Sequence, residues 1–129
     1  MAQIKIYGEK SELRAVRDRL SPLVHGCAVD ALGIPRDKLF QRFLALDAGD
    51  FMHPSDRSKR YTIVEVSMFE GRSIEAKKTF IRMLYERAKS ELNLDPIDLE
   101  ITIFETPRAN WGIRGLPGDE LDLNYKIDV

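Results

Sequence analysis

The chain has 129 residues, yet it contains only one cysteine, Cys27, and one tryptophan, Trp111. A single cysteine cannot form an internal disulfide bond, which is typical of a reducing compartment. No stretch approaches the ~20 apolar residues of a membrane-spanning helix, and the opening MAQIKIYGEK lacks the apolar core of a secretion signal. We therefore expect a cytoplasmic protein with no membrane partner, in which Cys27 is a packed core residue.

The chain also lacks an excess of charge of either sign. Its 20 Lys and Arg residues are balanced by 21 Asp and Glu residues, for a net charge of −1. A protein that binds nucleic acid or anionic lipid normally shows a basic surplus on at least one face. The basic residues of DRSKR (residues 56–60) are accompanied by aspartates, which favours a solvated loop. We expect no nucleic-acid partner.

Metal and cofactor motifs are missing as well. The sequence contains no CxxC, HExxH, GxGxxG or P-loop pattern. His53 lies near Asp50 and Asp56, but this spacing is not that of a defined metal site. His25 falls within a predicted helix, where a structural role is expected. We therefore expect no metal ion and no cofactor.

Two segments show apolar residues at helical spacing. In the first, Ser11 is the expected N-cap and the helix continues to residue 32, with Pro22 kinking it rather than ending it. The second helix begins after Ser73 and ends at Leu92, where NLDP stops it. The apolar positions are Leu13, Val16, Leu20, Leu23, Val24, Cys27 and Ala31 in the first helix, and Phe80, Ile81, Leu84, Ala88 and Leu92 in the second.

Four segments have strand-like patterns, and the third is rich in residues that favour strands. The predicted strands cover residues 4–8, 38–46, 61–71 and 98–105. The polar segment 47–60, broken by glycine and proline, is expected to be a loop or a short hairpin.

These elements repeat along the chain, which we interpret as a single domain of residues 1–129 with halves at about 1–60 and 61–129. Each half reads strand, glycine, serine-capped helix, proline junction and strand. Two β-α-β units with right-handed crossovers give an α+β fold, with a four-stranded mixed sheet and two helices on one face. The other face would be bare although the strands are apolar, so we expect self-association that covers it.

The most unusual segment is PRANWGIRGLPGD, residues 107–119, which is too rich in glycine for a helix or an ordinary strand. It places Trp111 between Arg108 and Arg114. One interpretation is a solvated loop whose tryptophan caps the core. The other is the wall of a cleft with an anion-binding arginine beside it.

Three segments carry a resemblance to a known family. HGCAVDALGIP (residues 25–35), EGRSIEAKK (70–78) and ANWGIRG (109–115) resemble the malonate semialdehyde decarboxylase branch of the tautomerase superfamily. The tail after Trp111 resembles a bacterial subgroup of short tautomerase-like proteins still more closely. The resemblance implies the tautomerase (MIF-like) fold, a homotrimer, chemistry without a cofactor, an amino-terminal proline that moves protons, and arginines that bind a substrate carboxylate.

The chain departs from this family pattern at three positions. Ala2 stands where the proline would be, Lys38 aligns with the branch's acidic residue, and Glu70 replaces the first of its two arginines. Removal of Met1 would leave Ala2 with a free α-amine, whose unperturbed pKa is about 7.7–8. Such an amine can act as a base or form a Schiff base. A plain strand end is the alternative for Ala2.

Arg72 is the arginine that matches the family. Between a strand end and a helix start, it is placed to bind a carboxylate together with the helix N-terminus; the alternative is a salt bridge to Glu70 or Glu75. Arg114 could add a second charge and Trp111 an apolar wall, unless Trp111 packs at a subunit contact. Lys38 would add positive charge to the site, or lie in a solvated turn.

We therefore predict a cofactor-independent tautomerase-like enzyme that tautomerises or decarboxylates a small oxo-carboxylate. Ala2 and Arg72 are the predicted catalytic residues, and Arg72, Arg114, Trp111 and Lys38 are the predicted substrate-binding residues. Two alternatives stay open. The chain could be an inactive homologue that binds a small carboxylate or serves as a scaffold, or it could be a purely oligomeric interaction module.

Overall fold

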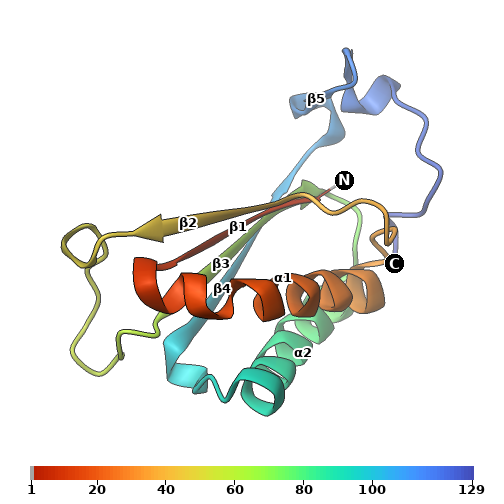
Figure 1. Ribbon diagram of the computed structural model, residues 1–129. Coiled ribbons are helices and arrows are strands. Elements are labelled where there is room, and N and C mark those ends of the chain that lie inside the picture. The colour runs from red at the N-terminus through yellow and green to blue at the C-terminus, as the bar shows by residue number, and fades with distance from the viewer. Residues whose placement is uncertain (1) are drawn as a thin grey trace.

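A computed structural model describes residues 2–129 and shows one mixed sheet (Figure 1). Its strands run in the order β2-β1-β3-β4. β1 is parallel to β2 and antiparallel to β3, and β3 is parallel to β4. The strands are β1 (Ala2–Glu9), β2 (Gln41–Leu46), β3 (Thr62–Phe69) and β4 (Leu99–Thr106).

Two helices, α1 (Lys10–Leu32) and α2 (Ile74–Leu92), lie side by side on one face of this sheet (Figure 1). The predicted α+β fold, with a four-stranded mixed sheet and both helices on one face, is therefore confirmed. α1 continues through Pro22 without ending, as predicted. Among residues 2–129 no helix is both long and apolar enough to cross a membrane.

The helix starts show one correct and one wrong prediction. Ser73 caps α2 as expected, since its hydroxyl accepts the Ala76 N–H at 3.0 Å. α1 instead begins at Lys10, and its N-cap is Glu9 rather than Ser11. The Glu9 carboxylate accepts the backbone N–H groups of Ser11 and Glu12, both at 3.2 Å. An acidic side chain satisfies these donors and also favours the positive end of the helix dipole, so the chain passes from β1 into α1 without a loop.

The second strand is shorter than predicted. It begins at Gln41 rather than at residue 38, because a turn in which the Lys38 N–H donates to Pro35 O at 2.9 Å comes before it. The loop 47–60 contains only a single turn of 3₁₀-helix, Ala48–Asp50. This loop is fixed to the start of β4 by the buried Asp98, whose carboxylate accepts the Ser58 N–H at 2.7 Å and hydroxyl at 2.6 Å.

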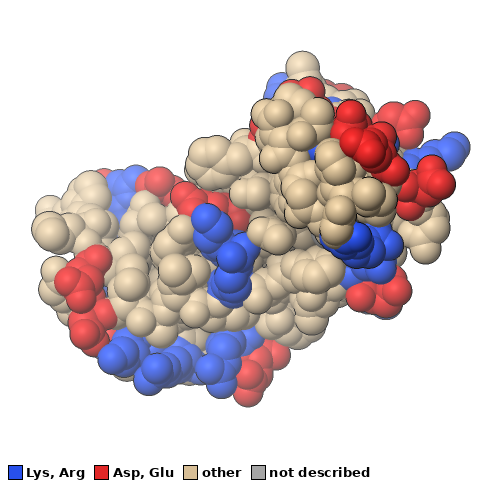
Figure 2. Space-filling view, turned by 90° about the horizontal axis from the view of Figure 1, so that it is seen from above, with Lys and Arg blue, Asp and Glu red and all other residues tan. Residues whose placement is uncertain are grey.

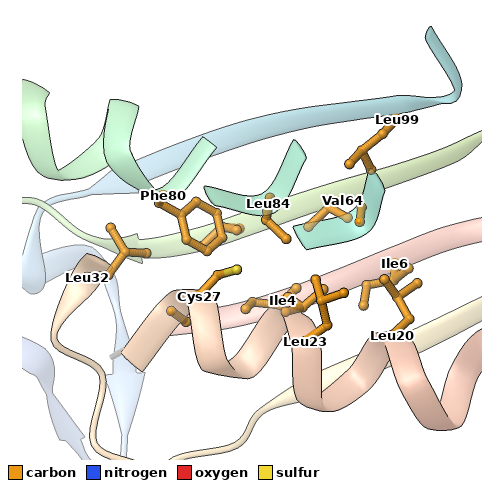
Figure 3. Close-up of a cluster of buried hydrophobic side chains, with 14 of the residues drawn as sticks. Ile4, Ile6, Leu20, Leu23, Cys27, Leu32, Val64, Phe80, Leu84 and Leu99 are labelled. Atoms are coloured by element: carbon orange, nitrogen blue, oxygen red, sulfur yellow. The ribbon is translucent and has the colours of Figure 1, made fainter. Parts of the chain in front are cut away.

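The hydrophobic core fills the space between the sheet and the helices (Figure 3). Cys27 is fully buried there, as predicted. Burial of each large apolar side chain contributes about 1.5–3 kcal/mol to stability. The central members are Ile4 and Ile6 from β1, Val64 from β3, Leu20, Leu23 and Cys27 from α1, and Phe80 and Leu84 from α2.

The opposite face of the sheet is uncovered and carries a mixture of side chains (Figure 2). Tyr7 donates to Glu65 at 2.6 Å and Arg42 donates to Gln3 at 2.7 Å. Phe104 on β4 is 51% exposed. The face is thus less apolar than the strand patterns suggested, because polar pairs alternate with apolar side chains across it.

After β4 the chain forms a small hairpin and a tail. The hairpin consists of β5 (Gly112–Ile113) and β6 (Leu116–Pro117), with 3₁₀ turns at Arg108–Asn110 and Gly118–Glu120. Arg114 and Gly115 occupy its tip with φ values of 53° and 84°, the left-handed conformation that a two-residue hairpin turn requires. Residues 121–129 then return toward the start of α2 (Figure 1).

Candidate active site

The end of β3 brings the predicted site residues to one end of the sheet. Ala2 lies opposite Met68 in the β1–β3 pairing, and Nη1 of Arg72 lies 3.8 Å from the Met68 sulfur. Trp111 packs edge-on against Phe69, with ring centroids 5.2 Å apart. Consecutive strand residues point to opposite faces. Ala2 and Arg72 therefore lie at Met68, on the helix side of the sheet. Trp111 lies at Phe69, the next residue of β3, whose side chain points to the other face.

Arg72 is buried, with only 4% of its surface exposed. Gly71 adopts a φ of 135°, which favours glycine and lets the chain turn between β3 and α2. The Arg72 Nε donates to the carbonyl of Leu32, the last residue of α1, at 2.7 Å. The Nη2 atom is buried and has no hydrogen-bond partner within the part of the chain that the structure describes. The guanidinium therefore carries one buried donor that lacks an acceptor within residues 2–129.

The electrostatic surroundings of Arg72 also suit an anion. Burial lowers the pKa of Arg72, while Tyr125 and Glu105 raise it. None of the ion pairs among residues 2–129 includes Arg72, so the salt bridge to Glu70 or Glu75 is not formed. A buried cation without an acidic partner is costly, and a bound carboxylate would supply one with charge-assisted hydrogen bonds.

The helix N-terminus contributes less to this site than expected. The Ser73 N–H donates to Val129 O at 3.0 Å, and the Ala76 N–H donates to the Ser73 hydroxyl. The chain's own tail and cap therefore take up these two donors. The guanidinium of Arg72, rather than the start of α2, is the main group that can receive an anion.

The sequence did not reveal the role of Arg108, which holds the tail in place. Its Nε donates to Gly118 O at 3.0 Å and its Nη2 to Leu121 O at 2.6 Å. Its guanidinium also lies over the Phe69 ring, 5.6 Å from the centroid. Arg108 therefore joins the tail to the end of β3.

Tyr125 is a second residue that the sequence analysis missed. Burial raises its pKa, whereas the charges of Arg72, Arg114 and Arg108 lower it. Its side chain is therefore within electrostatic reach of all three arginines. A signal was present in the sequence, because apolar and polar residues alternate from Leu121 to Ile127, which predicts one inward-facing side.

Arg114 and Lys38 lie less centrally. Arg114 is exposed at the hairpin tip, although its charge acts on Tyr125. Lys38 precedes β2 at the same end of the sheet as Ala2, because Gln41 pairs with Ile4 in parallel register. Within residues 2–129 no side-chain hydrogen bond or ion pair joins Lys38 to Arg72, so the role of Lys38 in binding stays a prediction.

Other candidate groups lie outside this arrangement. His25 contacts Arg36 O through Nε2 at 2.7 Å, and His53 packs against the rings of Phe51 and Tyr61. Within residues 2–129 no three His, Cys, Asp or Glu side chains gather closely enough to hold a metal ion. A small pocket does occur at the opposite end of the sheet, where Gly8, Glu12 and Arg60 are among its lining residues, far from Arg72 along β3.

Comparison with known proteins identifies the family. The model of a family described as "Tautomerase enzyme" matches residues 38–114, more than half of the chain. The chain belongs to this tautomerase family. It is 34% identical over 55 residues to a probable tautomerase of Ralstonia nicotianae, a match that covers 43% of this chain and 79% of that protein. It is 32% identical over 57 residues to the 2-hydroxymuconate tautomerase of Comamonas testosteroni, covering 44% and 90%.

Solved structures agree with this tautomerase assignment. A malonate semialdehyde decarboxylase has 21% identity and a TM-score of 0.78, over 89% of this chain and 93% of that one. The FG41 malonate semialdehyde decarboxylase has 26% identity and a TM-score of 0.75, over 85% and 87%. A native fused 4-OT has 21% identity and a TM-score of 0.75, over 92% and 98%. The resemblance stated from the sequence is confirmed, and so, at this general level, is the prediction of a tautomerase-like enzyme.

Proposed function

We propose that this tautomerase-family protein interconverts the keto and enol forms of a small oxo-carboxylate, or decarboxylates such an acid, without a cofactor. The observation that carries the proposal is the buried Arg72, which has an unpartnered Nη2 and no acidic partner among the described residues. The relatives support the reaction class, because they include a 2-hydroxymuconate tautomerase and a malonate semialdehyde decarboxylase.

In this proposal Arg72 binds the substrate carboxylate and Arg114 adds positive charge from the hairpin tip. Trp111 packs against Phe69, on the other face of the sheet from Met68, so it contributes an apolar wall at this end of the sheet rather than a direct contact with Arg72. Lys38 increases the positive potential near the start of β2. A cation held beside the carbonyl stabilises the negative charge that develops on its oxygen. The same stabilisation serves enolisation and the loss of carbon dioxide, because both place an electron pair in an enolate.

The α-amine of Ala2 is the proposed base. Ala2 is 5% exposed and lies opposite Met68, the residue that Arg72 contacts. Burial and a nearby guanidinium both lower the pKa of an amine. The neutral amine takes a proton from the carbon beside the carbonyl, and the electron pair of that C–H bond moves into the enolate. Met1 lies outside the described residues, so its removal stays a prediction.

We also propose that the chain assembles as a trimer, with the uncovered sheet face against its neighbours. Structures of fused 4-OT that share this fold are described as trimers. The exposed Phe104 would then be buried. The trimer, like a cytoplasmic location, is part of the proposal.

A second candidate function is carboxylate binding without turnover. It is favoured by Ala2 itself, because a primary amine on alanine lacks the rigid ring of proline. Arg72 would keep the same role in this case, and only proton transfer would be lost.

Ketonisation of phenylenolpyruvate, followed by ultraviolet absorbance, tests the proposal. We expect Arg72→Met to lower kcat/KM by about 100-fold or more, the usual cost of removing a charge-stabilising donor. Arg14→Met is the matched control, because Arg14 is exposed on α1. A wild-type rate no faster than the solution reaction, or an equal rate in Arg72→Met, would refute the enzyme proposal.

The role of the amine is tested separately. Intact mass shows whether Met1 is removed, and a Gly-Ser insertion before Ala2 displaces the amine from the start of β1. We expect the insertion variant to bind pyruvate but to lose turnover. Wild-type protein that binds pyruvate yet shows no turnover would establish the binding function instead.

A further inference from the structure

The tail that follows the hairpin is fixed on both sides of Tyr125. Before it, Arg108 donates to Leu121 O at 2.6 Å. After it, Ile127 packs against Gly71, where an added Cβ would lie 3.3 Å from the Ile127 side chain. Beyond that, Val129 O accepts the Ser73 N–H at 3.0 Å. These contacts hold the intervening residues beside the turn that carries Arg72.

Tyr125 stands two residues before Ile127, which packs against Gly71, so the alternation along the tail gives both side chains the same facing. The ring of Tyr125 is half-buried, and its pKa is raised by burial against the opposing charges of Arg72, Arg114 and Arg108. Of the three arginines, Arg72 acts on it most strongly. A tyrosine with a raised pKa stays protonated near neutral pH, so its hydroxyl can donate a hydrogen bond.

The arginines around it are not equally available. Arg108 uses Nε and Nη2 on backbone carbonyls, and Arg72 uses Nε on Leu32 O. The unpartnered Nη2 of Arg72 is left for a carboxylate. A carboxylate bound there would place its adjoining substrate atoms near the turn against which the tail holds Tyr125.

We propose that Tyr125 is a substrate-binding residue of this site, whose hydroxyl donates a hydrogen bond to the carbonyl oxygen of a 2-oxo acid held by Arg72. This inference rests on the proposed function and adds a residue and a substrate class to it. A 2-oxo acid fits because its carbonyl oxygen adjoins its carboxylate, and Tyr125 lies on the tail segment that packs beside the turn carrying Arg72. The hydrogen bond strengthens as the oxygen becomes an enolate. The family match ends at residue 114, so Tyr125 lies beyond the shared region.

The test compares two ligands that differ at one carbonyl group. Dissociation constants for pyruvate and for propionate are measured by NMR titration of wild-type protein and of Tyr125→Phe. We expect the variant to bind pyruvate about tenfold more weakly and propionate equally well, because one hydrogen bond to the carbonyl oxygen is lost. The kcat for phenylenolpyruvate should also fall, with the melting temperature unchanged.

Tyr85→Phe is the matched control. Tyr85 donates to Leu99 O at 2.7 Å, at the start of β4 and away from the site. Its loss should leave the ratio of the two dissociation constants unchanged. Arg72→Met should weaken both ligands, because both contain a carboxylate.

The outcomes separate this inference from the proposed function. If Arg72→Met abolishes binding but Tyr125→Phe binds pyruvate as wild type does, the role of Tyr125 is refuted and the proposed function stands. If Tyr125→Phe weakens pyruvate and propionate equally, Tyr125 only anchors the tail, which also refutes the inference. If wild-type protein binds neither acid and shows no turnover, the proposed function fails and the inference fails with it.

Discussion

Two arginines flank β3 and allow a direct test of what Arg72 is for. Arg72 follows the strand and donates to Leu32 O at the end of α1. Arg60 precedes the strand and donates to Leu92 O and Asn93 O at the end of α2, at 3.0 and 2.9 Å. Both therefore satisfy carbonyls at a helix C-terminus. They differ in that Arg60 is partly exposed, whereas Arg72 is 4% exposed.

Substitution by methionine keeps much of the side-chain volume and removes the charge. In Arg72→Met, the lost charge-assisted hydrogen bond costs about 1.5–3 kcal/mol. Against this, the variant no longer buries a guanidinium without an acidic partner, a penalty of several kcal/mol. We therefore expect its melting temperature to equal or exceed that of the wild type. Arg60→Met recovers little burial penalty and should lose about 1–2 kcal/mol, or a few degrees.

The assay is thermal unfolding with and without pyruvate. At a hundred times its dissociation constant, a ligand stabilises the folded state by about 2.7 kcal/mol. Wild type and Arg60→Met should show this stabilisation, and Arg72→Met should not. A fall of about 2 kcal/mol or more in Arg72→Met without ligand would refute the reasoning, because Arg72 would then be a structural cap like Arg60.

Three further predictions concern other parts of the molecule. Gly118→Ala should lower the free energy of unfolding by about 1–3 kcal/mol in urea titration, because its Cβ would lie 2.6 Å from Arg108 O, whereas Gly112→Ala, with nothing within 4 Å, should change it little. Burial raises the pKa of Cys27 from 9.0 to about 11. Because the folded chain keeps this proton to a higher pH than the unfolded chain, the free energy of unfolding should fall as pH rises from about 9 to 11. Cys27→Ala should flatten that part of the pH profile. Asp98→Ala should cost about 3 kcal/mol in the same urea assay, because Ser58 loses two short hydrogen bonds; Asp122→Ala, at an exposed position, should cost almost nothing.

The fold was largely predictable because its signals are local and repeated. Helical spacing in residues 11–32 and 73–92 and strand patterns around them sufficed to place the elements and the sheet. The errors lie where one contact changes a boundary. Glu9 replaced Ser11 as the cap of α1 because its carboxylate reaches two backbone donors, and the turn at Lys38 shortened β2.

The site was harder to predict than the fold. Ala2 and Arg72 were both predicted as site residues from the sequence, and the register at Met68 explains their proximity. The roles of Arg108 and Tyr125 depend on where the irregular tail lies. The alternation from Leu121 to Ile127 indicates which side chains share a face, but it does not fix the path of the segment. Their contacts join residues that no local rule connects.

Met68 and Phe69 are adjacent in β3 but serve two different surroundings, one beneath the sheet with Arg72 and one against Trp111. A single peptide unit thus separates Met68, which contacts the buried guanidinium of Arg72, from Phe69, against which the indole of Trp111 packs. The fluorescence of the single tryptophan therefore reports on the surroundings of Phe69, one residue away from the contact between Met68 and Arg72.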